Sequence, residues 1–156
     1  MTDFSYLNVD NAYKLINQKV TKTPLVTNDY INNLLEAEIY FKLENLQNTG
    51  SFKLRGATHK ITKLIETVKD SGVVAYSSGN HAQAVAYASM INSISAKIIM
   101  PKTAPQIKIE NTKNYGAEVI LYDTYFQNRE EIGIEIQKKD NSCLLYTSPS
   151  PRDRSS

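Results

Sequence analysis

The stretch that decides the fold is GVVAYSSGNHAQAVAYASMINSISAKIIM, which runs from Gly72 to Met100. Its apolar run GVVAY (72–76) is typical of a buried strand. The polar loop SSGN follows directly, and a helix rich in small residues is expected from His81 to about Ile94. AKIIM (96–100) is the next strand. Strand, helix and strand in this order predict a right-handed crossover within a parallel sheet.

The same alternation continues along the chain. Pro101 to Pro105 is expected to turn into a polar helix that ends at Tyr115–Gly116. A strand is predicted over 117–122 and a helix over 126–139, in which Ile132 and Ile136 face inward. The pattern therefore predicts an α/β fold, with an open three-layer unit over 72–139 and a small α/β domain over 72–142.

A single helix is predicted before this unit. Ser51 can cap its start, and Asp70–Gly72 ends it. The helix carries one apolar stripe, formed by Leu54, Ala57, Ile61, Leu64, Ile65 and Val68. We interpret 53–71 as a connecting helix.

The first part of the chain, 1–52, does not show this alternation of apolar strands and long helices. It contains a short amphipathic helix from Val9 to Gln18, a helix from Asp29 through Ala37, and an alternating strand from Glu38 to Leu43. These elements are too few to bury a core of their own. We therefore expect an arm of a second domain whose remainder is missing.

Composition excludes several classes of protein. The 156 residues are 41% apolar and 22% charged, with 18 Lys+Arg against 16 Asp+Glu, which excludes a disordered chain, a collagen and a disulfide-rich miniprotein. The balanced charge gives no basic stripe for nucleic acid. No run of about 18 apolar residues could span a membrane. The N-terminus lacks the features of a secretory signal, and the lone Cys143 is compatible with a reducing compartment, so we expect a cytoplasmic protein.

The tail CLLYTSPSPRDRSS (143–156) departs from the rest in composition. It resembles one reading frame of a transposase adapter used in short-read library preparation. We interpret 143–156 as a non-native tail with no role in the fold, and Met1–Ser142 as the natural part of a longer gene product. The alternative is an ordinary flexible terminus.

A candidate binding loop lies at Ser77–His81. Ligands of open α/β sheets bind at the carboxyl ends of strands, and this loop also opens a helix. A helix start offers unpaired N–H groups and a positive dipole end, which suit a carboxylate or a phosphate, and Gly79 permits close backbone approach. The alternative is that Ser78 or Asn80 merely caps the helix.

Lys53 is a candidate nucleophile. A cation at the start of a helix opposes the helix dipole, and a partly buried lysine can act as an amine nucleophile. The alternative is that Lys53 is an ordinary surface lysine. A second candidate, His59, lies on the polar face of its predicted helix, and we expect it to be solvated. The sequence contains no metal-ligand spacing, no P-loop and no Gly-x-Gly-x-x-Gly, which disfavours a nucleotide-binding Rossmann domain.

Two motifs resemble those of a known family. KLENLQNTGSFKLRGA (Lys42–Ala57) and SSGNHAQA (Ser77–Ala84) resemble the two motifs of fold type II pyridoxal-phosphate enzymes of the threonine dehydratase and serine racemase group. The later run IIMPKTAPQIKIENTKNYGAEVILYD fits the same group, so the resemblance covers most of Met1–Lys139. It implies pyridoxal 5'-phosphate as cofactor, and makes 1–52 part of the larger, cofactor-binding domain.

The resemblance implies roles for particular residues. Lys53 would form the Schiff base with the cofactor and exchange the Cα proton on one face. Phe52 would lie against the pyridine ring, and Asn80 would donate to its phenolic oxygen. Substrate binding would fall to Ser77, Asn80, His81 and Arg129, which would hold the substrate carboxylate.

Ser78 bears on the activity. Many threonine dehydratases are similar here but carry alanine, whereas serine racemases carry serine. A hydroxyl opposite Lys53 would supply the second acid/base that racemisation needs. The resemblance therefore implies a serine racemase that is also an L-serine or L-threonine dehydratase (an ammonia-lyase). The alternatives are a threonine dehydratase only, a hydroxyaspartate dehydratase, or a non-catalytic α/β module that binds small anions.

Two family features are not matched. The glycine-rich phosphate loop and the residue that pairs with the pyridine nitrogen lie further on in the family, and no segment here resembles either. We therefore expect the 156-residue chain to bind cofactor poorly and to catalyse little. The resemblance implies a homo-oligomer for the full-length protein, with a small hydroxy amino acid as substrate.

Overall fold

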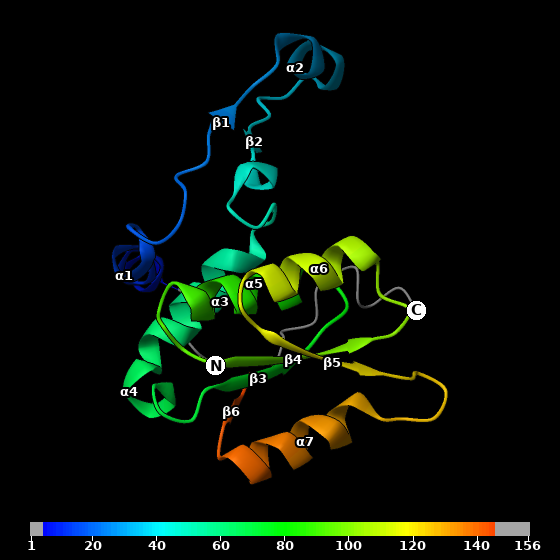
Figure 1. Cartoon of the computed structure of the whole chain (residues 1–156). Coiled ribbons are helices and arrows are strands. Elements are labelled where there is room, and N and C mark those ends of the chain that lie inside the picture. Colours follow the sequence, from blue (N-terminus) through cyan, green and yellow to red (C-terminus); the bar gives the residue numbers. More distant parts are fainter. Residues whose placement is uncertain (1–4, 146–156) are drawn as a thin grey trace.

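A four-stranded parallel sheet forms the centre of the protein (Figure 1). The computed structural model describes residues 5–145. The strands lie in the order β5-β4-β3-β6, with β3 at Val73–Tyr76, β4 at Ala96–Pro101, β5 at Glu118–Tyr122 and β6 at Cys143–Leu144. Helices α3, α5 and α6 cover one face and α7 covers the other. The predicted three-layer α/β architecture is confirmed.

The remaining elements fall close to their predicted positions. The helices are α1 (Tyr6–Ile16), α2 (Asp29–Leu35), α3 (Lys53–Lys63), α4 (Ile65–Val68), α5 (Asn80–Met90), α6 (Gln106–Asn114) and α7 (Arg129–Asp140). A short antiparallel pair, β1 (Leu25–Val26) and β2 (Phe41–Lys42), is followed by a 3-10 turn, η1 (Glu44–Leu46).

Helix α5 is buried because its side chains are small. Six of them have relative exposures of 1% or less: Ala82, Ala84, Val85, Ala86, Ala88 and Ser89. This helix packs against α3, α6, β3 and β4. Small side chains let the backbones of neighbouring elements approach closely, so α5 is held on several sides at once.

The predicted apolar stripe before the sheet is also confirmed. Leu54, Ile61 and Val68 are fully buried, and Leu64 and Ile65 pack against the same core. On the other face, Ile132 and Ile136 of α7 pack on Val74 and Ile99, as expected from their spacing.

Three local predictions were wrong. Ser51 does not cap a helix: α3 begins at Lys53 without a side-chain cap, and Ser51 is buried. The single helix over 53–71 is two helices, because the backbone leaves helical geometry at Leu64 (φ −99°, ψ 5°). Val68, in the second of these helices, is fully buried. The strand over 38–43 is reduced to β2, because its partner β1 is bounded by Pro24, which has no N–H for the ladder, and by α2, which begins at Asp29.

The exclusion of 143–156 from the fold was wrong for its first residues. Cys143 and Leu144 pair with Val73 and Val74 as β6, and both Leu144 and Leu145 are buried. An open sheet edge beside the apolar face of α7 accepts any extended apolar segment of this kind. The rest of the tail, 146–156, lies outside the described residues, and its non-native origin stays a prediction.

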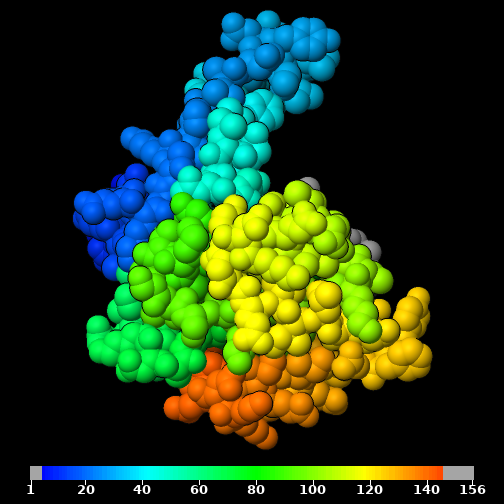
Figure 2. All heavy atoms as spheres, in the orientation of Figure 1, coloured from blue at the N-terminus to red at the C-terminus, as the bar shows by residue number. Residues whose placement is uncertain are grey.

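The segment 21–50 forms an arm that stands away from the sheet (Figures 1 and 2). Its large apolar side chains are exposed, among them Leu25, Tyr30, Leu34, Leu35, Tyr40, Phe41 and Leu46. By contrast, α1 packs against α3, where Ile16 and Val20 are buried. Exposed apolar surface of this extent is typical of an interaction surface. It supports our prediction that 1–52 belongs to a larger domain.

An ion pair joins the base of the arm to α3. Arg55 donates from Nη2 to Glu44 Oε1 (2.7 Å) and from Nε to Glu44 Oε2 (2.9 Å). Thr23 Oγ1 also donates to Glu44 Oε1 (2.6 Å), and Arg55 donates to the carbonyl oxygen of Thr21 (3.1 Å). These hydrogen bonds, those from Arg55 above all, hold the pKa of Glu44 below its ordinary value of 4.5.

Replacing this carboxylate tests the ion pair. Glu44→Gln should lower the free energy of unfolding by about 2 kcal/mol at neutral pH, because a partly buried, charge-assisted pair is lost. Since the folded pKa is the lower one, the contribution is complete above 4.5 and is lost as the pH falls through the folded value.

Urea unfolding of both proteins between pH 7 and pH 3 measures this effect. The difference between them should shrink at the acid end. Glu66→Gln, which removes an exposed pair with Lys69, is the control and should change little. A Glu44→Gln difference that does not vary with pH would contradict the pairing.

A second prediction concerns Gly72, which leads into β3. Its φ is +76°, and an added Cβ would touch Ser95 Oγ and lie 2.8 Å from the Ser95 carbonyl oxygen. That carbonyl accepts from Val73 N, so it cannot move freely. Gly116 has a φ of +81° with nothing within 4 Å of the added Cβ.

Gly72→Ala should therefore lower the free energy of unfolding by about 3 kcal/mol, and Gly116→Ala by about 1 kcal/mol, which is backbone strain alone. Urea unfolding of both variants measures the difference. Equal losses would show that the contact with Ser95 is unimportant.

Candidate functional site

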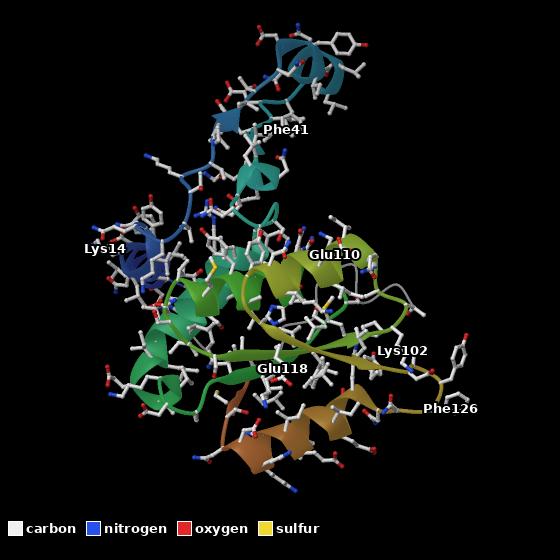
Figure 3. The ribbon with its side chains drawn as sticks, in the orientation of Figure 1. Lys14, Phe41, Lys102, Glu110, Glu118 and Phe126 are labelled. Carbon is white, nitrogen blue, oxygen red and sulfur yellow. The ribbon has the colours of Figure 1, made fainter. Side chains whose placement is uncertain are left out.

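The carboxyl ends of the parallel strands form one edge of the sheet. Strands β3, β4 and β5 run in the same direction, and their ends lead into the loops that begin α5, α6 and α7. Lys102, just after β4, and Phe126, beyond β5, lie at this end of the molecule (Figure 3). The structure confirms that the loop at 77–81 lies at the edge where open α/β sheets bind ligands.

The loop from β3 into α5 is held by the backbone. Ser77 N donates to the carbonyl oxygen of Ile99 (3.0 Å), which extends the pairing of β3 with β4. Ser77 Oγ accepts from Gly79 N (3.3 Å). Gly79 is the N-cap residue of α5, and no side chain caps this helix. The alternative that Ser78 or Asn80 merely caps the helix is therefore wrong.

The side chains of this loop differ in exposure. Ser78 is exposed, whereas Ser77, Asn80 and His81 are partly buried. Asn80 Oδ1 accepts a hydrogen bond from Lys108 Nζ of α6 (2.8 Å). The exposed hydroxyl of Ser78 is open to an incoming molecule, while the amide of Asn80 is already oriented.

Lys53 is the first residue of α3, the helix that packs most extensively on α5. Its side chain is partly buried, and Nζ lies 5.5 Å from the centroid of the Phe52 ring. The Phe52 side chain is exposed. Just before them, Thr49 and Ser51 are buried, and neither Oγ atom has a hydrogen-bond partner among residues 5–145.

Arg129 lies on the other face of the sheet from Lys53 and α5. Arg129 begins α7, and its guanidinium carbon lies 5.2 Å from the centroid of the Tyr76 ring. Tyr76 packs with the cluster under α7, on the opposite face of the sheet from α5. The role of Arg129 toward a substrate carboxylate stays a prediction.

Two further predictions concern histidine and metal. His59 was expected to be solvated, but it is partly buried on α3. Burial, aided by the positive charges of Lys63 and Lys60, lowers its pKa below the ordinary value. Within residues 5–145, no group of three or more His, Cys, Asp or Glu side chains could hold a metal ion.

Sequence reasoning missed two polar contacts between α6 and α5. Besides the bond from Lys108 to Asn80, Asn111 Nδ2 donates to Gln83 Oε1 (3.1 Å). In each helix the two residues are three positions apart, so they share a face. The sequence signalled only a polar helix here, and nothing in its pattern indicated which residues of α5 it would contact.

The residues present fit the reactive end of pyridoxal phosphate. That cofactor presents an aldehyde, a phenolic oxygen and an aromatic ring. Lys53 offers a primary amine, Phe52 an exposed ring, and Asn80 an amide whose NH₂ group is not taken by Lys108. The unpartnered hydroxyls of Thr49 and Ser51 are further polar groups beside the lysine.

A comparison with known protein families agrees with this assignment of a pyridoxal-phosphate site. The family model described as "Pyridoxal-phosphate dependent enzyme" matches residues 16–151. A serine racemase from Schizosaccharomyces pombe is 42% identical over 141 residues, which cover 90% of this chain and 44% of that protein. An L-threonine ammonia-lyase from Thermotoga maritima is 42% identical over 144 residues, which cover 92% of this chain and 36% of that protein.

Solved structures of related enzymes also resemble this chain. The crystal structure of serine racemase from Dictyostelium discoideum superposes with a TM-score of 0.86 at 38% identity, covering 92% of this chain and 47% of that one. The chain thus spans less than half the length of these relatives. This chain belongs to the pyridoxal-phosphate dependent enzymes.

Proposed function

We propose that the complete protein is a serine racemase that also acts as an L-serine or L-threonine dehydratase, an ammonia-lyase. One observation carries the proposal: Lys53 begins α3 and the Ser77–His81 loop begins α5, on two helices that pack against each other. The names of the relatives support the same chemistry.

Each side chain would have a distinct task. When bound, pyridoxal phosphate supplies the electron sink that makes the Cα proton of an amino acid removable. Lys53 would hold the cofactor through its amine and would move the Cα proton on one face. The exposed hydroxyl of Ser78 would hold or donate a proton on the opposite face, and Asn80 would bind the phenolic oxygen of the cofactor.

The substrate carboxylate would lie at the start of α5. The first turn of a helix presents N–H groups and a positive dipole end, which favour an anion. No side chain caps α5 within the described part of the chain, which supports this placement. We infer that Ser77, Asn80 and His81 bind the carboxylate, with Arg129 contributing from α7.

The organisation of the complete protein is also a proposal. We infer that 1–52 belongs to a larger, cofactor-binding domain, 53–71 connects the two domains, and 72–142 is the small domain. The exposed apolar side chains of the arm support the first assignment. We further propose a cytoplasmic homo-oligomer that takes a small hydroxy amino acid. Within residues 5–145, no helix has the length and apolarity that crossing a bilayer requires.

The activity of Ser78→Ala tests the proposal. The complete protein with pyridoxal phosphate and L-serine should form both D-serine and pyruvate. Ser78→Ala should reduce D-serine formation by about 100-fold or more, the usual contribution of an acid/base group, and should spare pyruvate formation. Lys53→Ala, the control, should abolish both. Chiral chromatography and a coupled pyruvate assay measure the two products.

The other outcomes separate the alternatives. Pyruvate or 2-oxobutanoate without D-serine in the parent protein would indicate a dehydratase only. If Ser78→Ala loses D-serine and pyruvate formation equally, this result would count against the assignment of Lys53 and Ser78 to opposite faces of the substrate. No turnover of any hydroxy amino acid would favour a non-catalytic module that binds small anions.

A further inference from the structure

We propose that Lys108 is a positioning residue that fixes the Asn80 amide with its NH₂ group toward the phenolic oxygen of the cofactor. The inference rests on the proposed function, because it concerns the residue proposed to bind that oxygen. It adds a residue from α6, a helix that lies outside both sequence motifs.

The direction of the hydrogen bond determines the orientation of the amide. Lys108 Nζ lies 2.8 Å from Asn80 Oδ1. An ammonium group has only donors, so the oxygen of the amide must face it. The NH₂ group then points away from Lys108, with two donors left for an acceptor. Without Lys108, either end of the amide could take that place.

The packing of α6 on α5 holds the pair in register. One turn further along, Asn111 Nδ2 donates to Gln83 Oε1 (3.1 Å), and the Gln83 side chain is almost fully buried. Thr112 is fully buried and donates to the carbonyl oxygen of Lys108 (2.7 Å). Lys108 is thus held opposite Asn80 by the buried parts of both helices.

The charges around Lys108 and Asn80 favour the binding of an anionic group. Lys108 lies in the first turn of α6 and Asn80 in the first turn of α5, so an ammonium group lies close to two positive helix ends. No carboxylate within residues 5–145 forms an ion pair with Lys108. A positive charge placed there without a carboxylate fits the binding of an ionised oxygen.

Cofactor titrations of the complete protein test the inference. Lys108→Met should weaken binding of pyridoxal phosphate by about tenfold, since a charge-assisted bond that orients a donor is lost. The visible absorption of the bound cofactor should also change its pH profile. Removing a cation disfavours the ionised phenolic oxygen, so the transition should move to higher pH. Lys108→Arg should restore both properties.

Two further variants separate positioning from other effects. Lys113→Met removes an exposed lysine from the same helix and should leave binding and spectrum unchanged. On an Asn80→Ala background, Lys108→Met should weaken binding by less than about twofold, because the side chain through which it acts is gone. Circular dichroism confirms that each variant is folded.

The result that overturns the inference differs from the one that overturns the proposed function. If the parent protein binds the cofactor and Asn80→Ala weakens binding, but Lys108→Met behaves like Lys113→Met, Lys108 does not position Asn80. An equal effect of Lys108→Met with and without Asn80 would overturn it as well. Failure of the parent protein to bind pyridoxal phosphate at all would instead contradict the proposed function and, with it, this inference.

Discussion

The burial of α5 between the sheet, α3 and α6 is the constraint on which the rest of the structure depends. Its alanine side chains leave room for close approach on several sides, so the helix has one position relative to β3 and β4. The loop that joins β3 to α5 is fixed at both ends as a result. The exposed Ser78 therefore lies on a loop that the buried elements on both sides hold in place.

Lys53 is positioned in a related way, by a buried helix on one side and a polar network on the other. Leu54 and Ile61 bury α3 against α5, while Arg55 binds Glu44 at the base of the arm. The lysine directly precedes Leu54 and Arg55 and is partly buried, next to the exposed ring of Phe52. The arm beyond the network carries exposed apolar side chains, as in Phe41 (Figure 3).

Much of this could be predicted from periodicity and composition. The apolar runs at 72–76 and 96–100 and the small residues between them indicate a strand–helix–strand unit. The apolar stripe before this unit indicates the buried face of α3. Contacts between segments distant in sequence could not be predicted. The bond from Lys108 to Asn80 and that from Arg55 to Glu44 depend on how helices and the arm pack. The predicted cap at Ser51 was wrong, because α3 begins only at Lys53 and the Ser51 side chain is buried before it.

The site at the start of α3 and α5 is tested most directly by chemical trapping. The complete protein is incubated with pyridoxal phosphate, reduced with borohydride and digested, and the labelled lysine is identified by mass spectrometry. A Schiff-base lysine is fixed irreversibly by this reduction. The account predicts a single label on Lys53. Labels spread over many lysines, or one label on another lysine, would contradict it.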